Sequence, residues 1–172
     1  MMNKVLTAYF SRPGYNYLGG EIVKLAVGNT RKAAEKANAA AGGDIFRIDT
    51  VRQYSEDYSA CVEESRQEIR ANARPELKEY LPDIDGYDTV ILCYPCWCGT
   101  APMAVFTFLQ HYDFTGKTIL PLCTNEGSGM GASEADIKKL CPGAQVKTGL
   151  SVRGGGVDGA DEAIARWLSR SL

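Results

Sequence analysis

The sequence predicts an α/β domain in which helices cover both faces of a parallel β-sheet. Strand-like and helix-like segments alternate along all 172 residues, which is typical of this fold class. Residues 89–94 and 118–123 are almost continuously apolar, as expected for strands that are buried on both faces. The length corresponds to one domain, so we expect residues 1–172 to form a single unit.

Five strands are expected, at residues 5–10, 45–48, 89–94, 118–123 and 146–152. Pro121 lies inside the fourth of these segments and has no N–H to donate to a neighbouring strand. The strand must therefore have a free N–H position at Pro121 or end before it.

Five helices are expected between and after the strands, at residues 30–41, 56–72, 102–110, 133–140 and 159–169. The last is the clearest, because its apolar residues recur with helical spacing and form one stripe. Residues 15–27 contain Gly19-Gly20 between two short apolar runs. This segment predicts a hairpin inserted before the first helix, where it could form a flap.

Composition and charge argue against several functional classes. Nineteen basic and 21 acidic residues give a net charge of −2, which offers no electrostatic surface for nucleic acid. The longest nearly apolar stretch, residues 90–98, is too short to span a membrane and contains Pro95. The N-terminus lacks a signal-peptide core, so we expect a cytoplasmic protein that is not inserted in a membrane.

Ligands of open parallel sheets bind beyond the carboxyl ends of the strands, so the residues after each strand carry the functional prediction. Ser11 and Arg12 follow the first strand, and Gly28, Asn29 and Thr30 lead from the insert into the first helix. Small hydroxyl and amide side chains at a helix N-terminus suit a phosphate group. Alternatively, Asn29 and Thr30 only cap the helix.

Two further turns contain aromatic residues and glycines. After the third strand come Pro95, Cys96, Trp97, Cys98 and Gly99. Trp97 could cover a planar ring, or it could be an ordinary core residue. After the fourth strand come Thr124, Gly127, Ser128 and Gly129, where glycines allow the backbone to approach a ligand closely, unless the loop is simply flexible.

Taken together, these turns resemble the flavodoxin family, specifically its short-chain bacterial branch. The resemblance rests on Tyr94-Pro95-Cys96-Trp97-Cys98-Gly99-Thr100 and Thr124-Asn125-Glu126-Gly127-Ser128-Gly129-Met130-Gly131, and on shorter matches elsewhere. It implies a flavodoxin-like three-layer α/β/α sandwich with a five-stranded parallel sheet in the order 2-1-3-4-5. It also implies one non-covalently bound FMN.

The resemblance assigns the predicted residues to three parts of an FMN site. Ser11, Asn29 and Thr30 would hold the phosphate, and Arg12 and Gly28 would shape its loop. Pro95, Cys96, Trp97, Cys98 and Gly99 would line the isoalloxazine, and Thr124, Gly127, Ser128 and Gly129 would form a third wall. No catalytic side chain is required, because the flavin carries the redox chemistry.

The chain departs from the family pattern in two places. The insert splits the first motif, so Gly14-Tyr15-Asn16 is an alternative phosphate segment to Gly28-Asn29-Thr30; the latter is favoured because it leads directly into a helix. Cys98 stands where the family has a second tryptophan, which removes one aromatic wall.

Other chemistries fit the residues less well. Cys93, Cys96 and Cys98 lack a fourth ligand for a metal or iron–sulfur site, and a Cys96–Cys98 disulfide would be strained, so separate thiols are favoured. His111 is the only histidine, and Glu126 stands at the first glycine position of a G-x-S-x-G nucleophile elbow around Ser128, which disfavours a hydrolase.

Two flavin functions follow. In the first, the protein carries electrons between redox partners, which it would meet through acidic residues at positions 56, 57, 63, 64 and 126. In the second, it is an NAD(P)H-dependent FMN reductase of quinones or similar small acceptors, with residues 15–27 and 54–58 framing the substrate pocket. The small net charge offers little electrostatic steering to a protein partner.

Overall fold

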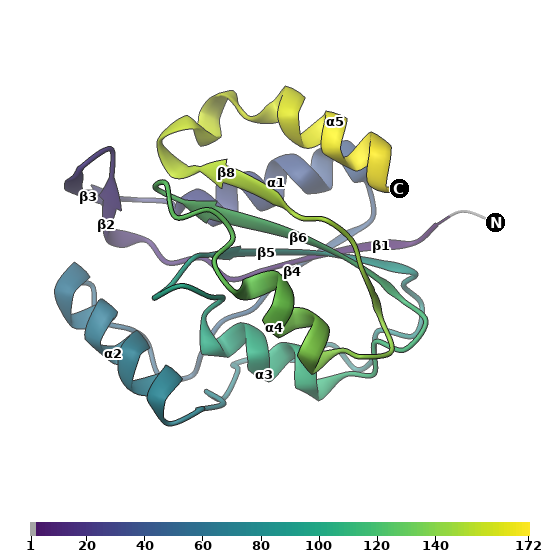
Figure 1. Cartoon of the computed structure of the whole chain (residues 1–172), viewed down its shortest axis with the longest axis horizontal. Coiled ribbons are helices and arrows are strands. Elements are labelled where there is room, and N and C mark those ends of the chain that lie inside the picture. Colours follow the sequence, from purple (N-terminus) through teal and green to yellow (C-terminus); the bar gives the residue numbers. More distant parts are fainter. Residues whose placement is uncertain (1–2) are drawn as a thin grey trace.

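The computed structural model describes residues 3–172 and consists of a twisted sheet between two layers of helices (Figure 1). Met1 and Met2, which begin the predicted domain and the N-terminal segment used to predict location, lie outside the described residues. Of the helices in the described part of the chain, none has the length and apolarity needed to cross a membrane.

The main sheet has the predicted parallel topology. Its strands are β1 (Val5–Tyr9), β4 (Asp44–Arg47), β5 (Thr89–Pro95), β6 (Thr118–Asn125), β7 (Gln145–Val146) and β8 (Leu150–Arg153). They are ordered β4-β1-β5-β6-β7, with β8 also paired to β6, and every pair is parallel. Counting β7 and β8 as one edge, this is the order 2-1-3-4-5, so the predicted fold class is confirmed.

The predicted fifth strand, residues 146–152, is instead divided into β7 and β8. Lys147 N–H donates to the Ile119 carbonyl at 3.0 Å, so the backbone groups of Ile119 face the β7 and β8 edge of β6. Pro121 lies two residues further along β6, and its backbone groups therefore face the same edge. Pro121 has no N–H for the next bond, and Gly149 N–H donates to Glu134 Oε2 at 2.8 Å rather than to the sheet. Strand β6 therefore continues through Pro121, and its neighbour is interrupted there.

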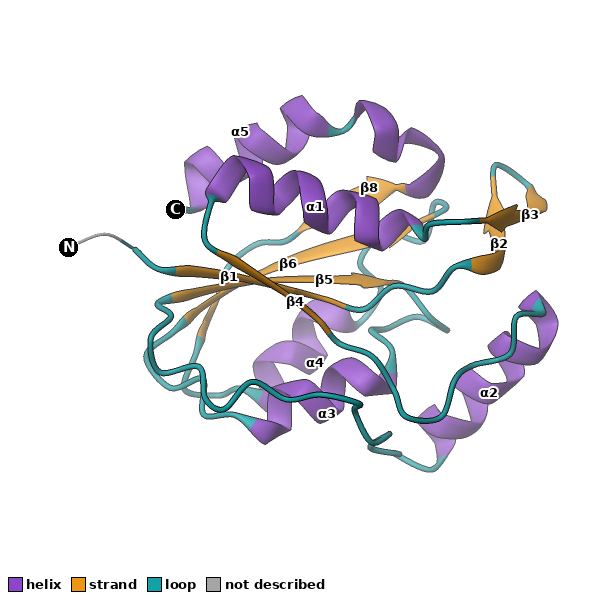
Figure 2. Ribbon diagram, turned by 180° about the vertical axis from the view of Figure 1, so that it is seen from behind, coloured by secondary structure: helices purple, strands orange, loops and turns teal. Residues whose placement is uncertain are grey.

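Within residues 3–172, five α-helices and one 3₁₀-helix surround the sheet. Helices α1 (Asn29–Ala41) and α5 (Asp161–Ser171) cover one face, and α3 (Met103–His111) and α4 (Ser133–Leu140) cover the other (Figure 2). Helix α2 (Tyr58–Arg70) lies at the end of the sheet where β1 and β5 finish, and the 3₁₀-helix η1 (Gly154–Gly159) precedes α5.

Side chains along the central strands point alternately to the two faces of the sheet, which divides the core into two parts. In β1, Leu6 and Ala8 pack toward α3 and α4, whereas Val5 and Tyr9 pack toward α1 and α5. Helix α1 meets the sheet through small residues: Ala33, Ala34 and Ala37 are completely buried. The small side chains allow the helix backbone to lie close to the strands.

Residues inserted between β1 and α1 form a separate antiparallel hairpin. Strand β2 (Gly14–Leu18) pairs with β3 (Glu21–Leu25), and Gly19 and Gly20 make the turn with positive φ angles of 60° and 91°. The hairpin projects beyond the carboxyl ends of the sheet strands, on the same side as the start of α2 (Figures 1 and 2).

Enlarging Ala37 should destabilise the fold, because the residue is fully buried between α1 and the sheet. We expect Ala37→Leu to lower the free energy of unfolding by about 1–3 kcal/mol through overpacking. Ala39→Leu, the same change at an exposed position of the same helix, should alter it by less than about 0.5 kcal/mol. Urea unfolding curves of both variants test this, and equal effects would contradict the packing.

Candidate functional site

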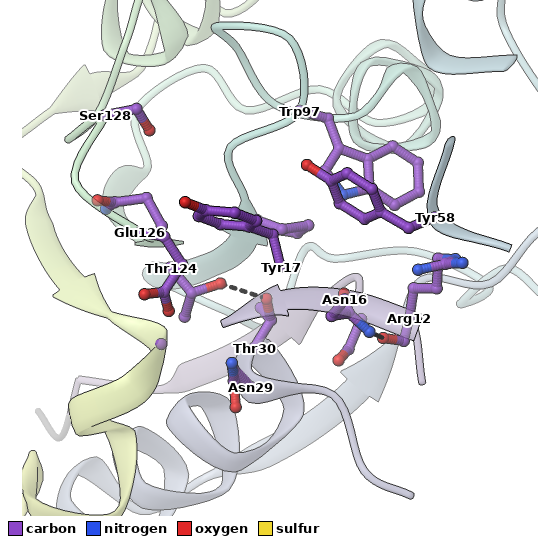
Figure 3. Close-up of a pocket in the computed structure, with 14 residues that line it drawn as sticks. Arg12, Asn16, Tyr17, Asn29, Thr30, Tyr58, Trp97, Thr124, Glu126 and Ser128 are labelled. Carbon is purple, nitrogen blue, oxygen red and sulfur yellow. Dashed lines mark hydrogen bonds between the residues drawn. The ribbon is translucent and has the colours of Figure 1, made fainter. Parts of the chain in front are cut away.

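A pocket of about 310 Å³ lies at the carboxyl ends of the sheet strands, between the hairpin, the start of α1 and the loops that follow β5 and β6 (Figure 3). Eight residues predicted for the site line it: Ser11, Arg12, Asn29, Thr30, Pro95, Trp97, Thr124 and Ser128. The pocket has one polar end and one aromatic end, and different elements build each.

The start of α1 forms the polar end. Asn29 and Thr30 do not cap this helix with their side chains; the N-cap is Gly28, and Ser11 Oγ accepts from Arg31 N–H at 3.1 Å. A Cβ on Gly28 would lie 2.3 Å from Ser11 Oγ, so glycine is needed for this contact. Within residues 3–172, the amides of Asn29 and Thr30 have no partner and remain available as donors.

A buried hydroxyl pair joins this end to the centre of the sheet. Thr30 Oγ1 and Thr124 Oγ1 lie 2.6 Å apart, and both residues are almost completely buried. The bond connects the first turn of α1 to the end of β6. It therefore fixes the helix N-terminus relative to the loop that follows β6.

The alternative phosphate segment, Gly14-Tyr15-Asn16, lies in β2 rather than at a helix N-terminus. Asn16 lines the pocket, but its Nδ2 donates to the carbonyls of Arg12 and Gly14 at 3.2 and 3.1 Å. Its amide donors thus stabilise the local turn. Of the two segments, Gly28-Asn29-Thr30 is the one that lies at a helix N-terminus.

Arg12 has a positioning role in this arrangement. Its Nη1 donates to the Tyr15 carbonyl at 2.6 Å, and its Nη2 donates to the carbonyls of Ser55 and Glu56, each at 2.7 Å. The guanidinium therefore joins the base of the hairpin to the segment that leads into α2. Its donors are directed at backbone carbonyls.

Trp97 forms the main surface of the aromatic end. It is half-buried, and its ring packs edge to face against Phe10 at 5.1 Å and Tyr54 at 4.9 Å between ring centroids. Tyr54 is in turn held by a 2.5 Å hydrogen bond to Glu68. Trp97 thus packs against the core and also lines the pocket.

The loop after β6 has a defined internal structure. Asn125 Oδ1 accepts from the N–H groups of Gly127 and Gly129, both at 3.0 Å, while its Nδ2 donates to Ser151 Oγ at 2.8 Å. Gly127 and Gly129 have positive φ angles of 118° and 68°. One side chain therefore anchors the turns of this loop and connects it to β8.

A model of the Flavodoxin family matches residues 4–171. The chain belongs to the flavodoxin family. A crystal structure of a protein from Bacteroides eggerthii, described as a flavoprotein, is 32% identical over 99% of this chain and 98% of that chain, with a TM-score of 0.79.

More distant structures share the fold. A protein from Bacteroides uniformis, also described as a flavoprotein, is 26% identical over 97% of this chain and 98% of that chain, with a TM-score of 0.76. A flavoprotein from Lactobacillus acidophilus in complex with FMN is 21% identical over 92% and 98% of the two chains, with a TM-score of 0.65. No curated protein matches this flavodoxin-family chain.

Six of the predicted site residues do not line the pocket: Gly28, Cys96, Cys98, Gly99, Gly127 and Gly129. Gly28 lies beneath its polar end. Cys98 is exposed, has a positive φ of 51° and borders an adjoining cavity of about 60 Å³ beside α2. Gly99 has a φ of 90°, and its carbonyl accepts from Ala132 N–H at 2.8 Å, which holds the two loops together.

The pocket also contains six residues outside the predicted set: Asn16, Tyr17, Tyr58, Asn125, Glu126 and Gly154. Asn16 and Tyr17 lie in the insert, and Tyr58 lies in the segment 54–58. The sequence predicted that both segments frame a substrate pocket. Glu126 was expected only as an acidic surface residue. Its Oε1 accepts from Gly155 N–H at 2.9 Å and its Oε2 from Gly19 N–H at 3.2 Å.

Cys96 lies beside the pocket loops as an acidic thiol. Hydrogen bonds from the Cys123 thiol, and also from Ser128 and the Gly99 backbone, lower the pKa of Cys96 to about 6, although partial burial opposes this. The pKa of Cys123 is raised, because it donates to Cys96 and is buried. All six cysteines are free thiols, and residues 3–172 contain no group of three or more His, Cys, Asp or Glu placed to hold a metal.

Alkylation of Cys96 should therefore rise with pH around a midpoint near 6, rather than near the 8.5 or so of an ordinary thiol. Mass spectrometry of iodoacetamide-treated protein measures this site by site. Cys123→Ala removes the main hydrogen-bond donor and should move the midpoint upward. A wild-type midpoint near 8.5 would contradict the network.

The same thiolate makes stability depend on pH. Because the pKa of Cys96 is lower in the folded than in the unfolded chain, its contribution is complete above the ordinary pKa of a thiol and is lost as the pH falls toward 6. We expect Cys96→Ser to flatten the wild-type increase in stability between pH 6 and 9.

Proposed function

We propose that this chain binds FMN non-covalently in the pocket and transfers electrons through it, as a carrier between redox partners. The observation that carries the proposal is the polarity of the pocket, with amides and hydroxyls at the start of α1 and aromatic rings around Trp97. FMN has the same polarity, with a phosphate at one end and a planar ring at the other. The FMN complex of the related Lactobacillus acidophilus flavoprotein supports the choice of ligand.

The phosphate would be held by the amides of Asn29 and Thr30 and by the hydroxyl of Ser11. Donors at a helix N-terminus, together with the helix dipole, favour a phosphate without requiring a lysine. The nearby carboxylate of Glu126 already accepts two backbone N–H groups. Its negative charge is thus partly compensated by donors other than those offered to the phosphate.

The ring would lie at the aromatic end of the pocket. Pro95 and Trp97 would contact it, while Cys96, Cys98 and Gly99 would shape the loop behind them. Thr124, Gly127, Ser128 and Gly129 would form the third wall, because Asn125 holds the backbone of that loop in place. Positive φ angles at Gly99 and Gly129 make these turns difficult for other residues.

When bound, FMN supplies the redox chemistry. The chain's own residues determine the affinity for the cofactor and its exposure to solvent, and no side chain is required to exchange a proton with a substrate.

A second candidate, an NAD(P)H-dependent FMN reductase of quinones or similar small acceptors, is favoured by one observation. The mouth of the pocket is framed by the hairpin and by the start of α2, through Tyr17 and Tyr58. Such a frame suits a small molecule better than a protein surface. An electron carrier would instead use the acidic residues around the same edge.

Anaerobic visible spectroscopy of the purified protein with added FMN tests two things: whether FMN binds, and whether the protein is a carrier or a reductase. Binding should shift the flavin absorption bands, and photoreduction should then bleach them. With a carrier, NADH or NADPH should leave the bound flavin oxidised, whereas rapid two-electron bleaching would favour the reductase. Spectra identical to those of free FMN would overturn FMN binding.

The phosphate assignment is tested by comparing FMN with riboflavin, which lacks the phosphate. Ser11→Ala removes a hydroxyl donor to a charged group, so we expect FMN affinity to fall by about tenfold or more and riboflavin affinity by less than about threefold. Calorimetric titration measures both affinities. Ser59→Ala, at an exposed position of α2, is the control and should change neither. Equal losses for both ligands would contradict the assignment.

A further inference from the structure

Two cysteines meet where β5 and β6 end. In the parallel pairing of these strands, Tyr94 is opposite Cys123 and Pro95 is opposite Thr124. Cys96 is the first residue after β5, and its N–H donates to the Thr124 carbonyl at 2.9 Å. The core toward α3 and α4 contains Tyr94 and Cys123, and Cys96 packs against it. Both thiols therefore lie on the same face of the sheet.

The two thiols differ in accessibility and in protonation. Cys123 is completely buried, whereas Cys96 is half-buried and can be reached by a small molecule. The Cys123 thiol donates to the Cys96 sulfur, and further hydrogen bonds to that sulfur come from Ser128 and the Gly99 backbone. These donors favour the thiolate of Cys96, which is the nucleophilic form of the side chain. An accessible nucleophile thus has a second sulfur in hydrogen-bond contact.

The other cysteines are placed differently. Cys93 lies in β5 but belongs to the core toward α1 and α5, on the opposite face of the sheet. Cys98 is exposed, and its Sγ donates to the Val62 carbonyl of α2 at 3.9 Å. The remaining two lie in α2 and at the end of α4. Cys123 is therefore the thiol that the fold brings to Cys96.

We propose that Cys96 and Cys123 are a thiol–disulfide pair, which a hydroperoxide oxidises reversibly to an intramolecular disulfide. Cys96 is the thiol that meets the oxidant, and Cys123 is the thiol that resolves the product. The inference goes beyond the proposed function, because it concerns two thiols of the chain and needs no bound flavin.

The oxidation has two steps. First, the Cys96 thiolate attacks an oxygen of the hydroperoxide, so that an S–O bond forms and the O–O bond breaks. The sulfur loses two electrons and becomes a sulfenic acid, while the leaving oxygen gains them and takes a proton from water. Second, the Cys123 sulfur attacks the Cys96 sulfur, so that the S–S bond forms and the S–O bond breaks. The departing hydroxide takes the proton of Cys123 and leaves as water.

The disulfide joins two loops of the pocket. Its formation requires the two sulfurs to approach to about 2 Å. Cys123 is fixed in β6, whereas Cys96 lies in the loop after β5, so that loop is the part that moves. Cys123 Sγ also lies 3.8 Å from the Gly129 carbonyl oxygen of the loop after β6. The bond therefore forms at the point where the loops that contribute Trp97 and Ser128 to the pocket converge.

Peptide mapping of the full-length protein tests the pairing. Cleavage after lysine and arginine places Cys123 alone in the peptide 118–138, whereas Cys96 shares the peptide 79–117 with two other cysteines. The reduced protein is exposed to dilute hydrogen peroxide, its remaining thiols are blocked with iodoacetamide in denaturant, and the peptides are analysed without reductant. We expect the two peptides to appear as one disulfide-linked species in monomeric protein, and to separate after treatment with dithiothreitol.

Single variants assign the sulfurs. Cys96→Ser and Cys123→Ala should each abolish the link between the two peptides. In Cys123→Ala, Cys96 should proceed to sulfinic acid instead, because its sulfenic acid has no partner thiol. Cys98→Ala is the matched control, since Cys98 lies in the same loop and is more exposed, and it should keep the link at the wild-type yield. Circular dichroism of each variant establishes that the fold is retained.

Several outcomes would overturn the pairing. In the wild type these are two thiols that stay free in peroxide, Cys96 sulfinic acid beside an unlinked Cys123, and a link found only in covalent dimers. Among the variants they are a link that persists in Cys96→Ser and a link that is lost in Cys98→Ala. None of these results bears on FMN binding, and a protein that binds no FMN could still form the disulfide. The failure of this inference and the failure of the proposed function are therefore distinguishable.

Discussion

Gly28 lies so close to Ser11 and Arg12 that a Cβ at this position would be 2.3 Å from the Ser11 hydroxyl oxygen and 2.8 Å from the Arg12 carbonyl oxygen. Through this contact the end of β1 reaches the start of α1 despite the residues inserted between them. Ser11 can then accept from Arg31 N–H, and Thr30 can bond to Thr124. The polar end of the pocket depends on these three connections.

A second set of contacts transforms a loop insertion into a wall of the pocket. Arg12 uses its guanidinium to join the hairpin base to the segment before α2, and Glu126 holds the hairpin tip. Both are charged side chains whose bonds go to backbone groups. Such bonds fix the course of the backbone. Arg12 and Glu126 therefore position the hairpin, and their charged groups are already used by these bonds.

The fold explains why polar and aromatic groups meet at one edge of the sheet. In a parallel sheet all strands end on the same side, so β1, β5 and β6 deliver their following loops to one place. Buried central strands leave few polar groups elsewhere in this layer. The loops therefore carry the chemistry, and side chains such as Asn125 give them their shape.

Sequence patterns alone determined the alternation of strands and helices and the segments that surround the pocket, because burial on two faces imposes apolar runs that are visible locally. The division at Pro121, the cap supplied by Ser11 and the position of Tyr17 depended on tertiary structure. Each involves groups distant in sequence: Pro121 with Gly149, Ser11 with Arg31, and a hairpin with Glu126. Such contacts have no local periodicity, so only the folded chain decides them.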